Sequence, residues 1–394
     1  MGASPGLEGA LIGSLLRGLS YGDLVIEWPD GSEQEFSGVE EGISARLVVK
    51  DKSAIRRALA GGSIGFAEGY MRGEWDTPDL SALLELGNTN IERIGRHKLA
   101  SPRRPLLRAL HAMRANGPSR ARRNIAYHYD LGNDFYRLWL DDTMTYSSAL
   151  FAGDSPRPDL GEAQRRKWDQ LLNLLQPGSN DHLLEIGCGW GGFALHAAKE
   201  AGCKVTGITL SQEQHDFASA RVAEEGLEGR VDIRIQDYRE VDQKFTGIAS
   251  IEMFEAVGQK YWPVFFGKVS DLLEHGRRAA IQTITIREES FEEYRTNPDF
   301  IQRYIFPGGM LPSPERFRHA ASERGLCVSE PSFFGESYAT TLEAWLARFD
   351  DVRDQVIGLG FDERFVRMWR YYLAYCRAGF RSNNVDVMHV TLER

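Results

Sequence analysis

The sequence predicts an α/β protein whose larger, C-terminal part is built on a mostly parallel sheet, with a small α+β domain before it. Three observations predict this. Strand-like and helix-like segments alternate from about residue 124 onward, and a glycine-rich turn separates the first such strand from its helix. Alternation of this kind produces βαβ units and a parallel sheet. The third observation is the length of 394 residues, which is enough for two domains with separate cores.

The segments of the larger part follow one another in a regular order. Each apolar run of strand length ends in polar or glycine residues, and each is followed by a longer segment with helical spacing. We expect strands within residues 182–188, 204–211, 231–237, 247–254 and 278–286, and helices within 191–202, 212–227 and 261–276.

The first hundred residues have a different pattern. "GDLVIEW" and "ISARLVV" alternate as half-buried strands do, and "GSIGFAEGYMRGEW" is an element bounded by glycines. Asp76 or Thr77 is expected to begin the next helix, with Pro78 in its first turn. We therefore divide the chain into an N-terminal domain for lipid, membrane or dimer contacts (1–100), a basic linker (101–123) and a catalytic domain (124–394).

Composition limits the compartment and the partners. No apolar run reaches the ~20 residues of a membrane span, and the first twenty residues do not form a signal peptide. The four cysteines are scattered, which is typical of reduced thiols without a structural zinc, so no metal is expected. A net charge of −9 argues against a general nucleic-acid binder. We expect a cytoplasmic protein, with a homo-oligomer as an open alternative.

Charge is unevenly distributed along the chain. Residues 91–123 hold ten Lys or Arg and one acid, a net +9, so the remainder carries −18. The segment is either a solvated linker or a patch that contacts anionic lipid headgroups, where each basic residue contributes roughly 1 kcal/mol. The second interpretation makes the protein peripheral at the inner membrane face.

The glycine-rich turn "LEIGCGWGG" indicates a nucleoside cofactor. Gly187, Gly189 and Gly192 fit the spacing G-x-G-x-x-G, which several cofactor classes share. A dinucleotide site needs an acid at the end of the second strand, where this chain has "GITLSQEQ". Glu185 instead lies inside the first strand, where an acid can receive the amino group of an amino-acid-bearing cofactor.

The end of the third strand supports the same cofactor. Asp237 and Tyr238 follow that strand and suit an adenine edge. Together these features favour S-adenosylmethionine over NAD. The alternative is that the glycines only allow close packing between strand and helix.

Seven stretches, taken in order, resemble the bacterial cyclopropane-fatty-acyl-phospholipid synthases and the related mycolic acid methyltransferases. "GFAEGYMRGEWD" also resembles the small N-terminal domain of the two-domain synthases, so the likeness covers nearly the whole chain. The seven stretches are "HYDLGNDFYRLWLDDTMTYSSALF", "LEIGCGWGG", "GITLSQEQ", "SIEMFEAVG", "RYIFPGGMLPS", "YATTLEAWLARF" and "YYLAYCRAGF".

The resemblance implies a class I S-adenosylmethionine-dependent methyltransferase fold, Rossmann-like and seven-stranded, with a helical insertion covering an acyl-chain tunnel. It also implies positions for the cofactor's methionine end, ribose and adenine. Together with Glu185, the expected cofactor residues are Tyr146, Ser147, Gly187, Gly189, Gly191, Thr209, Leu210, Gln214, Asp237 and Tyr238.

The resemblance further implies an active-site cluster that binds a bicarbonate ion, thought to act as the base. Glu255 and Tyr338 match the family's glutamate and tyrosine, and Ile284 with its backbone amide is retained. Ser148 stands where the family has a cysteine and Gln282 where it has a histidine; Ala256 replaces a second histidine. Because neither Ser nor Gln supplies the charge of a protonated histidine, bicarbonate binding is left open.

The expected reaction is methyl(ene) transfer to the cis double bond of an unsaturated phospholipid acyl chain, through a carbocation. Aromatic faces can stabilise that cation, and Tyr304, Phe306 and Tyr338 are candidates, with Phe254 and Trp262 more typical of core packing. Proton loss, with Glu255 as the expected base, would close a cyclopropane. A methyl-branched or methylene-branched chain is the alternative product, and a small-molecule methyltransferase is a more distant one.

Overall fold

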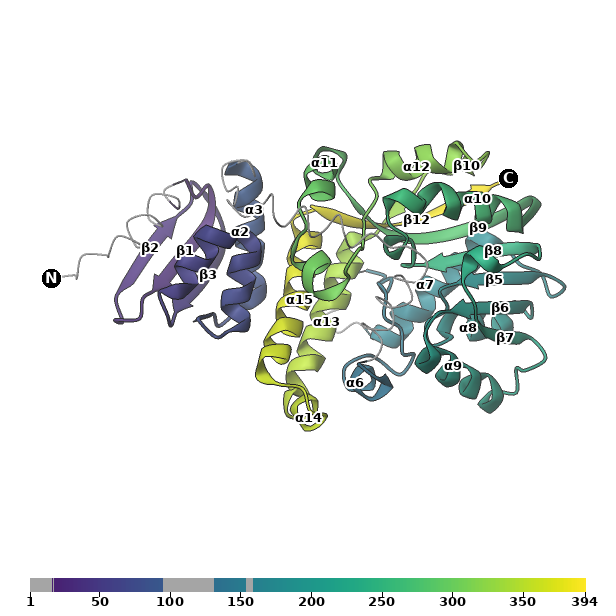
Figure 1. Cartoon of the computed structure of the whole chain (residues 1–394), viewed down its shortest axis with the longest axis horizontal. Coiled ribbons are helices and arrows are strands. Elements are labelled where there is room, and N and C mark those ends of the chain that lie inside the picture. The colour runs from purple at the N-terminus through teal and green to yellow at the C-terminus, as the bar shows by residue number, and fades with distance from the viewer. Residues whose placement is uncertain (1–15, 17, 95–130, 154–158) are drawn as a thin grey trace.

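A computed structural model describes residues 16, 18–94, 131–153 and 159–394 and shows two units side by side (Figure 1). The first unit has a small sheet covered by two helices. The second has a large sheet with helices on both faces, and a group of helices stands between that sheet and the first unit. The expected basic linker and both expected domain boundaries near residue 100 and residue 123 fall within 95–130, outside the described residues.

The first unit contains a four-stranded sheet in the order β2-β1-β3-β4. A hairpin joins β1 to β2, β3 runs parallel to β1, and β4 is antiparallel to β3. Leu24 and Ile26 alternate with more exposed residues along β1, as the sequence pattern predicts for a half-buried strand. The elements are β1 (Tyr21–Glu27), β2 (Glu33–Ser37), β3 (Glu40–Val49), α2 (Ser53–Met71), β4 (Trp75–Asp76) and α3 (Leu80–Ile94).

The expected helix start at Asp76 or Thr77 is wrong. Helix α3 begins at Leu80, because the Asp79 carboxylate accepts the amide of Ala82 and so caps the first turn. Asp76 is engaged elsewhere: it belongs to β4 and pairs with Lys50 at 2.8 Å.

The large sheet confirms the predicted α/β fold. Its path is β7-β6-β5-β8-β9-β12-β10, with β11 paired to β12 off this path. The pairings from β7 to β9 are parallel, and β12 runs antiparallel to β9. The bounds are β5 (His182–Ile186), β6 (Lys204–Thr209), β7 (Val231–Ile235), β8 (Phe245–Ile251), β9 (Leu273–Ile286), β10 (Cys327–Val328), β11 (Ser332–Phe333) and β12 (Val385–Glu393).

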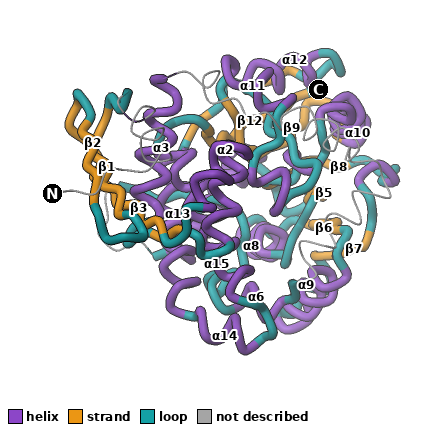
Figure 2. Tube along the Cα trace, turned by 60° about the vertical axis from the view of Figure 1, so that its left-hand side comes forward, coloured by secondary structure: helices purple, strands orange, loops and turns teal. Residues whose placement is uncertain are grey.

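Helices that follow the strands cover the two faces of this sheet, while later helices form the group beside the first unit (Figures 1 and 2). Helix α15 of that group contacts both α2 and α3. The helices are α6 (Asn133–Arg137), α7 (Leu160–Leu175), α8 (Gly192–Glu200), α9 (Gln212–Glu224), α10 (Trp262–Leu272), α11 (Glu288–Thr296), α12 (Pro314–Ser322), α13 (Gly335–Asp351), α14 (Arg353–Gly358) and α15 (Glu363–Arg381). Short helical turns are η2 (Tyr238–Glu240), η3 (Phe254–Ala256), η4 (Gln259–Tyr261) and η5 (Ile301–Ile305).

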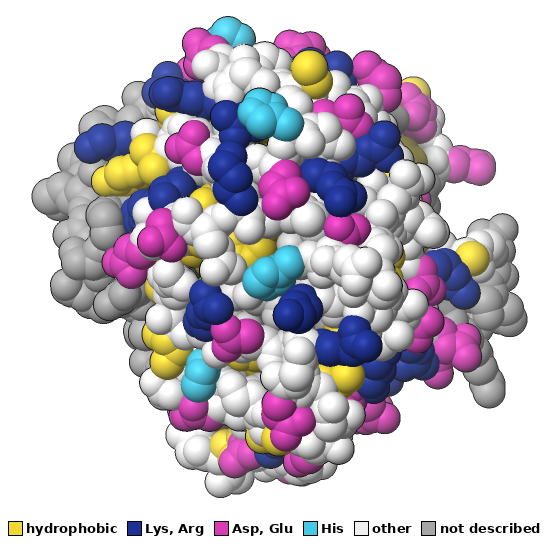
Figure 3. Space-filling model, turned by 90° about the vertical axis from the view of Figure 1, so that its right-hand side faces the viewer, with side chains coloured by type: hydrophobic (Ala, Val, Ile, Leu, Met, Phe, Trp, Pro, Cys, Tyr) yellow, Lys and Arg dark blue, Asp and Glu magenta, His cyan; other side chains and the backbone are white. Residues whose placement is uncertain are grey.

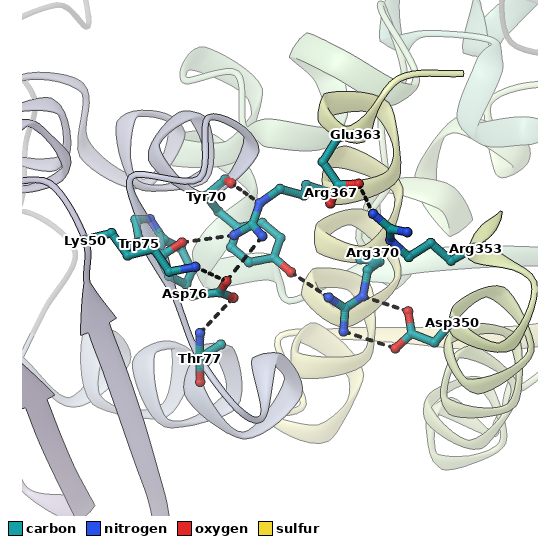
Figure 4. Close-up of polar contacts among 10 residues, drawn as sticks. All are labelled: Lys50, Tyr70, Trp75, Asp76, Thr77, Asp350, Arg353, Glu363, Arg367 and Arg370. Carbon is teal, nitrogen blue, oxygen red and sulfur yellow. Dashed lines mark hydrogen bonds and ion pairs between the residues drawn. The ribbon is translucent and has the colours of Figure 1, made fainter. Parts of the chain in front are cut away.

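A half-buried arginine joins the two units (Figure 4). Arg367 of α15 donates to the carbonyls of Tyr70 and Trp75 at 2.5 and 3.0 Å, and its guanidinium lies 3.9 Å from the centroid of the Tyr70 ring. Arg370, one turn later, donates to the Tyr70 hydroxyl and pairs with Asp350. Because these contacts are planar and directional, they fix α2 and β4 in one orientation against α15.

One apolar core crosses the same boundary. Leu24 and Ile26 of β1, Tyr70 of α2 and Trp345 of α13 belong to a single cluster of buried side chains. The first unit is therefore packed onto the second rather than tethered to it. Among the described residues, no helix is long and apolar enough to cross a membrane.

Candidate active site

A cavity of about 1220 Å³ joins the two units. At one end it is lined by the glycine turn after β5, and at the other by apolar side chains inside the first unit, including Leu24, Ile26 and Leu47. Its volume exceeds the roughly 300–1,000 Å³ typical of a site for one drug-sized ligand. The cavity can therefore hold a nucleoside cofactor and a long apolar molecule together.

The glycine turn lies at the carboxyl end of β5, where ligands of parallel sheets bind. Gly187 has a φ of 82°, and a Cβ there would lie 2.8 Å from the Cγ of Met253. Gly191 has a φ of 83° and caps α8, with Ala218 3.0 Å from the place of a Cβ. Side chains are excluded at both positions, so the backbone itself can approach a ligand closely.

Glu185 lies inside β5, and its carboxyl lines the cavity with only part of its hydrogen bonds made. Its side chain is 2% exposed, and its Oε2 has no hydrogen-bond partner among the described residues. Burial raises the pKa of this carboxyl, and Lys167 opposes the shift. A buried carboxylate oxygen without a partner costs free energy until a donor reaches it.

The other expected cofactor residues surround the same end of the cavity. Thr209 donates to Gln214 Oε1 at 2.7 Å. Asp237, which caps η2, forms an ion pair with Arg239. The expected cofactor residues that line the cavity are Tyr146, Ser147, Glu185, Gly187, Gly189, Thr209, Leu210, Gln214, Asp237 and Tyr238; Gly191 lies just behind the turn as the cap of α8.

These residues fit S-adenosylmethionine. The orphaned oxygen of Glu185 would receive its amino group, the glycine turn would lie beside it, and Asp237 with Tyr238 would lie at the nucleoside. When bound, this cofactor supplies an electrophilic methyl group. Lys167, which donates to Ser147 Oγ at 2.7 Å, lies in the same region, and its burial lowers its pKa to about 7.

At the reaction end, Glu255 is held on one side only. Its Oε1 accepts the amide of Ile284 at 2.6 Å and the hydroxyl of Thr283 at 3.0 Å, while its Oε2 has no partner among the described residues. Burial and the neighbouring negative charge of Glu252 raise the pKa of Glu255 to about 8. At neutral pH this carboxyl is therefore mostly protonated.

Glu255 has a second carboxylate beside it. Glu252, three residues earlier in "SIEMFEAVG", also lines the cavity. Tyr338 donates to Glu252 Oε2 at 2.6 Å, so the partner of the tyrosine is Glu252 rather than Glu255. The sequence did contain a signal for this residue, because a second acid at the end of an apolar strand is unusual for a packing role.

Ser148 and Gln282 were expected to face the active site directly, but they lie behind Glu252. The Ser148 amide donates to Glu252 Oε1 at 2.8 Å, and Gln282 Nε2 donates to the same oxygen at 2.7 Å. Both side chains are fully buried, and neither belongs to the described lining of the cavity, whereas Glu252 and Ile284 do. Ser148 and Gln282 thus contact Glu252, and Glu252 faces the cavity.

Tyr304 is not at the active site. Its hydroxyl donates to Glu68 of α2 at 2.6 Å, and Arg303 beside it pairs with the same carboxylate, so Tyr304 stabilises the boundary between the units. Phe254 and Trp262 stack on each other in the core, as packing residues do.

Sequence reasoning missed the aromatic wall contributed by α15. The stretch "YYLAYCRAGF" was recognised as a motif without a role for its rings. Tyr372 shares a hydrogen bond of 2.7 Å with Tyr146, and Phe380 packs on Tyr338 with ring centroids 4.5 Å apart. The aromatic residues of the cavity at this end are Phe306, Tyr338, Tyr371, Tyr372, Tyr375 and Phe380.

Comparison with known proteins identifies the family. Residues 117–390 match the family model described as mycolic acid cyclopropane synthetase. The tuberculostearic acid methyltransferase UfaA1 of Mycobacterium tuberculosis is 38% identical over 96% of this chain and 90% of its own length. The cyclopropane-fatty-acyl-phospholipid synthase of Escherichia coli K12 is 34% identical over 89% of this chain and 88% of its own length.

A solved structure of the same family also matches this chain. The mycolic acid cyclopropane synthase CmaA1 complexed with SAH and CTAB superposes with a TM-score of 0.65 at 32% identity, covering 69% of this chain and 98% of that chain. The chain therefore belongs to the mycolic acid cyclopropane synthetase family and is an S-adenosylmethionine-dependent methyltransferase.

Proposed function

We propose that this enzyme methylates the cis double bond of an unsaturated acyl chain carried by a membrane phospholipid. The observation that carries the proposal is the cavity, which runs from the cofactor turn to the apolar interior of the first unit. A small polar substrate would not need this apolar volume. Support also comes from relatives named for lipid substrates, of which one is a phospholipid synthase.

The proposed chemistry begins with attack of the alkene on the methyl group of the donor, which leaves a carbocation on the neighbouring carbon. A double bond is a weak nucleophile, so positioning and exclusion of water carry much of the rate enhancement. The faces of Tyr338, Tyr372 and Phe306 can stabilise the cation without attacking it. Loss of a proton from the new methyl group then closes a cyclopropane ring.

A branched product is the second candidate. The relative with 38% identity is named for a methyl-branched fatty acid, and this chain differs from the family pattern at Ser148, Gln282 and Ala256. A hydride shift before proton loss would give a methylene branch, and loss from an adjacent chain carbon would give a methyl-branched alkene.

The test uses the full chain, labelled S-adenosylmethionine and vesicles of monounsaturated phospholipid. Because cyclopropane and methylene products have equal mass, proton NMR of the extracted lipid separates them: ring protons lie upfield of the methyl region, and methylene protons lie in the vinyl region. Label that enters a free metabolite and no lipid would overturn the proposal.

Contact with anionic lipid is part of the proposal. The basic segment 91–123 lies largely outside the described residues, so its support is its charge. Figure 3 shows that the end of the second unit away from the first carries interspersed basic and acidic side chains, which is not the pattern of a membrane-binding face. Vesicle sedimentation should show binding that rises with the fraction of anionic lipid and falls with salt.

A further inference from the structure

We propose that the carboxylate of Glu252 is the proton acceptor of the reaction and takes the place of an added anion such as bicarbonate. This inference rests on the proposed function, since it assigns the base that completes the methylation of an alkene. It is carried by three observations: the contacts of Glu252, its backbone conformation and the orientation of Gln282.

The contacts of Glu252 use the donors that an anion would need. Its two oxygens accept hydrogen bonds from the Ser148 amide, Gln282 Nε2 and the Tyr338 hydroxyl at 2.6–2.8 Å. Ser148, Gln282 and Tyr338 are three of the residues that the family resemblance assigns to bicarbonate. With these donors engaged by an internal carboxylate, a second anion would have neither the hydrogen bonds nor a favourable charge environment.

Glu252 has an unfavourable backbone conformation. Its φ is 50°, a left-handed value that is unfavourable for a residue with a side chain. Such a conformation persists only where surrounding contacts enforce it, and these residues cluster at active sites. Here the carboxylate contacts enforce it, since they hold the side chain between β9 and α13 while the residue still lines the cavity.

Glu252 and His389 together fix the orientation of Gln282. Because an ionised carboxylate only accepts hydrogen bonds, the amide NH₂ of Gln282 faces Glu252. The amide oxygen then lies 2.7 Å from His389 Nε2 and accepts its hydrogen bond, and burial lowers the pKa of His389 to about 3, so the ring is neutral. Gln282 therefore donates to Glu252 without adding a positive charge, and the carboxylate keeps more of its basicity than it would beside a cation.

The two glutamates divide the roles of acid and base. Loss of hydration raises the pKa of Glu252, while its hydrogen bonds and Lys167 oppose that shift. Glu255 is raised to about 8 partly by the charge on Glu252. Glu252 accepts three hydrogen bonds and Glu255 accepts two, so the negative charge of the pair is better stabilised on Glu252 and a shared proton on Glu255. The other titratable groups that face Glu252 are Lys167 and Tyr338, with Cys376 close to the tyrosine.

The π electron pair of the alkene forms the new carbon–carbon bond while the carbon–sulfur bond of the donor breaks and leaves its pair on sulfur. Glu252 then removes a proton from the substrate cation, and the C–H electron pair forms the ring bond or the new double bond. The carboxyl formed on Glu252 releases its proton to water when the product leaves.

The first experiment compares Glu252→Gln with Glu255→Gln in the full chain. Glu252→Gln keeps the shape of the side chain but not its basicity, so kcat should fall by roughly 10²–10⁴-fold, while titration calorimetry gives an unchanged Kd for S-adenosylhomocysteine. It should also abolish the fall in kcat at low pH, because that fall is the protonation of Glu252. Glu255→Gln should lower kcat by about tenfold or less and retain that fall. The reverse pattern would overturn the assignment.

The second experiment measures bicarbonate dependence in CO₂-free buffer. The wild-type rate should not change when bicarbonate is added, and ¹³C NMR should detect no binding of labelled bicarbonate. Glu252→Ala, which opens the same space, should regain rate with added bicarbonate or formate, and its thermal unfolding shows whether it is folded. A wild-type rate that rises severalfold with bicarbonate would overturn this inference alone, whereas a wild-type enzyme that labels no lipid would overturn the proposed function.

Discussion

The cofactor end and the reaction end of the site each present a carboxylate to the cavity, and the two carboxylates have opposite surroundings. Glu185 in β5 leaves one oxygen without a partner among the described residues, whereas Glu252 at the end of β8 accepts three hydrogen bonds. Glu185 lies within β5 and Glu252 directly follows the neighbouring parallel strand β8, and both interact with the charge of Lys167. Glu185 therefore stays incomplete until a ligand with a positive group binds, while Glu252 is satisfied within the chain.

This difference indicates how each end acts. A buried carboxylate without a hydrogen-bond partner is stabilised when a ligand donates a hydrogen bond to it, so it contributes to recognition of that ligand. A satisfied carboxylate is held in one position before the substrate arrives, so it serves chemistry that depends on placement. Substitutions that exchange or weaken these properties test the comparison directly.

The largest effect on cofactor affinity is expected at the cofactor end. Glu185→Ala removes a charge-assisted hydrogen bond worth roughly 1.5–3 kcal/mol, so the Kd for S-adenosylhomocysteine should rise by roughly 10–150-fold in titration calorimetry. Glu252→Gln is the matched control, because it alters a buried carboxylate at the other end and should leave this Kd unchanged. Equal effects of the two variants on cofactor affinity would contradict the division between the ends.

A smaller effect is expected when one donor to Glu252 is removed. Tyr338→Phe deletes the 2.6 Å hydrogen bond but keeps the ring against Phe380, and this should lower kcat by about tenfold. Because the lost donor stabilised the ionised form, the pKa of Glu252 rises and the acidic limb of the rate profile moves to higher pH. An unchanged limb would show that Glu252 does not set it.

The smallest effect is expected at Lys167, whose charge acts on both Glu185 and Glu252. Lys167→Met removes a positive charge that favours ionised Glu252. The acidic limb of the pH–rate profile should therefore move to higher pH by about half a unit, which lowers the rate by about threefold at a pH on that limb. Since burial lowers the pKa of Lys167 to about 7, this lysine is charged below that pH and neutral above it. The profiles of the variant and the wild type should therefore differ below pH 7 and converge above pH 8. Profiles that diverge above pH 8 would contradict this assignment.

The cofactor end could be predicted from the sequence because its residues are local to strand ends. Gly187, Gly189, Thr209 and Asp237 each follow a strand of the parallel sheet, and the carboxyl ends of such strands meet at one edge. The positions of the strands and of the helices between them were predictable for the same reason. Hydrophobic spacing and glycine position determine them within a few residues.

The reaction end could not be predicted in the same way. Glu252 and Glu255 are three residues apart, and the one that meets Tyr338 is set by a contact with a residue 86 positions further along the chain. Tyr304 was misplaced for a related reason: its motif matched, but Glu68 from the other unit binds its hydroxyl. Contacts between distant segments depend on packing that no spacing rule contains.

By itself the sequence determined the α/β fold, the glycine turn and the kind of cofactor, since each follows from a short-range pattern of apolar, glycine and acidic residues. Only the tertiary structure decided which glutamate the donors hold, where the aromatic wall lies and that the cavity crosses into the first unit. The physical reason is that a carboxylate becomes a base or a binding group through its neighbours, and these neighbours come from strands and helices far apart in the chain.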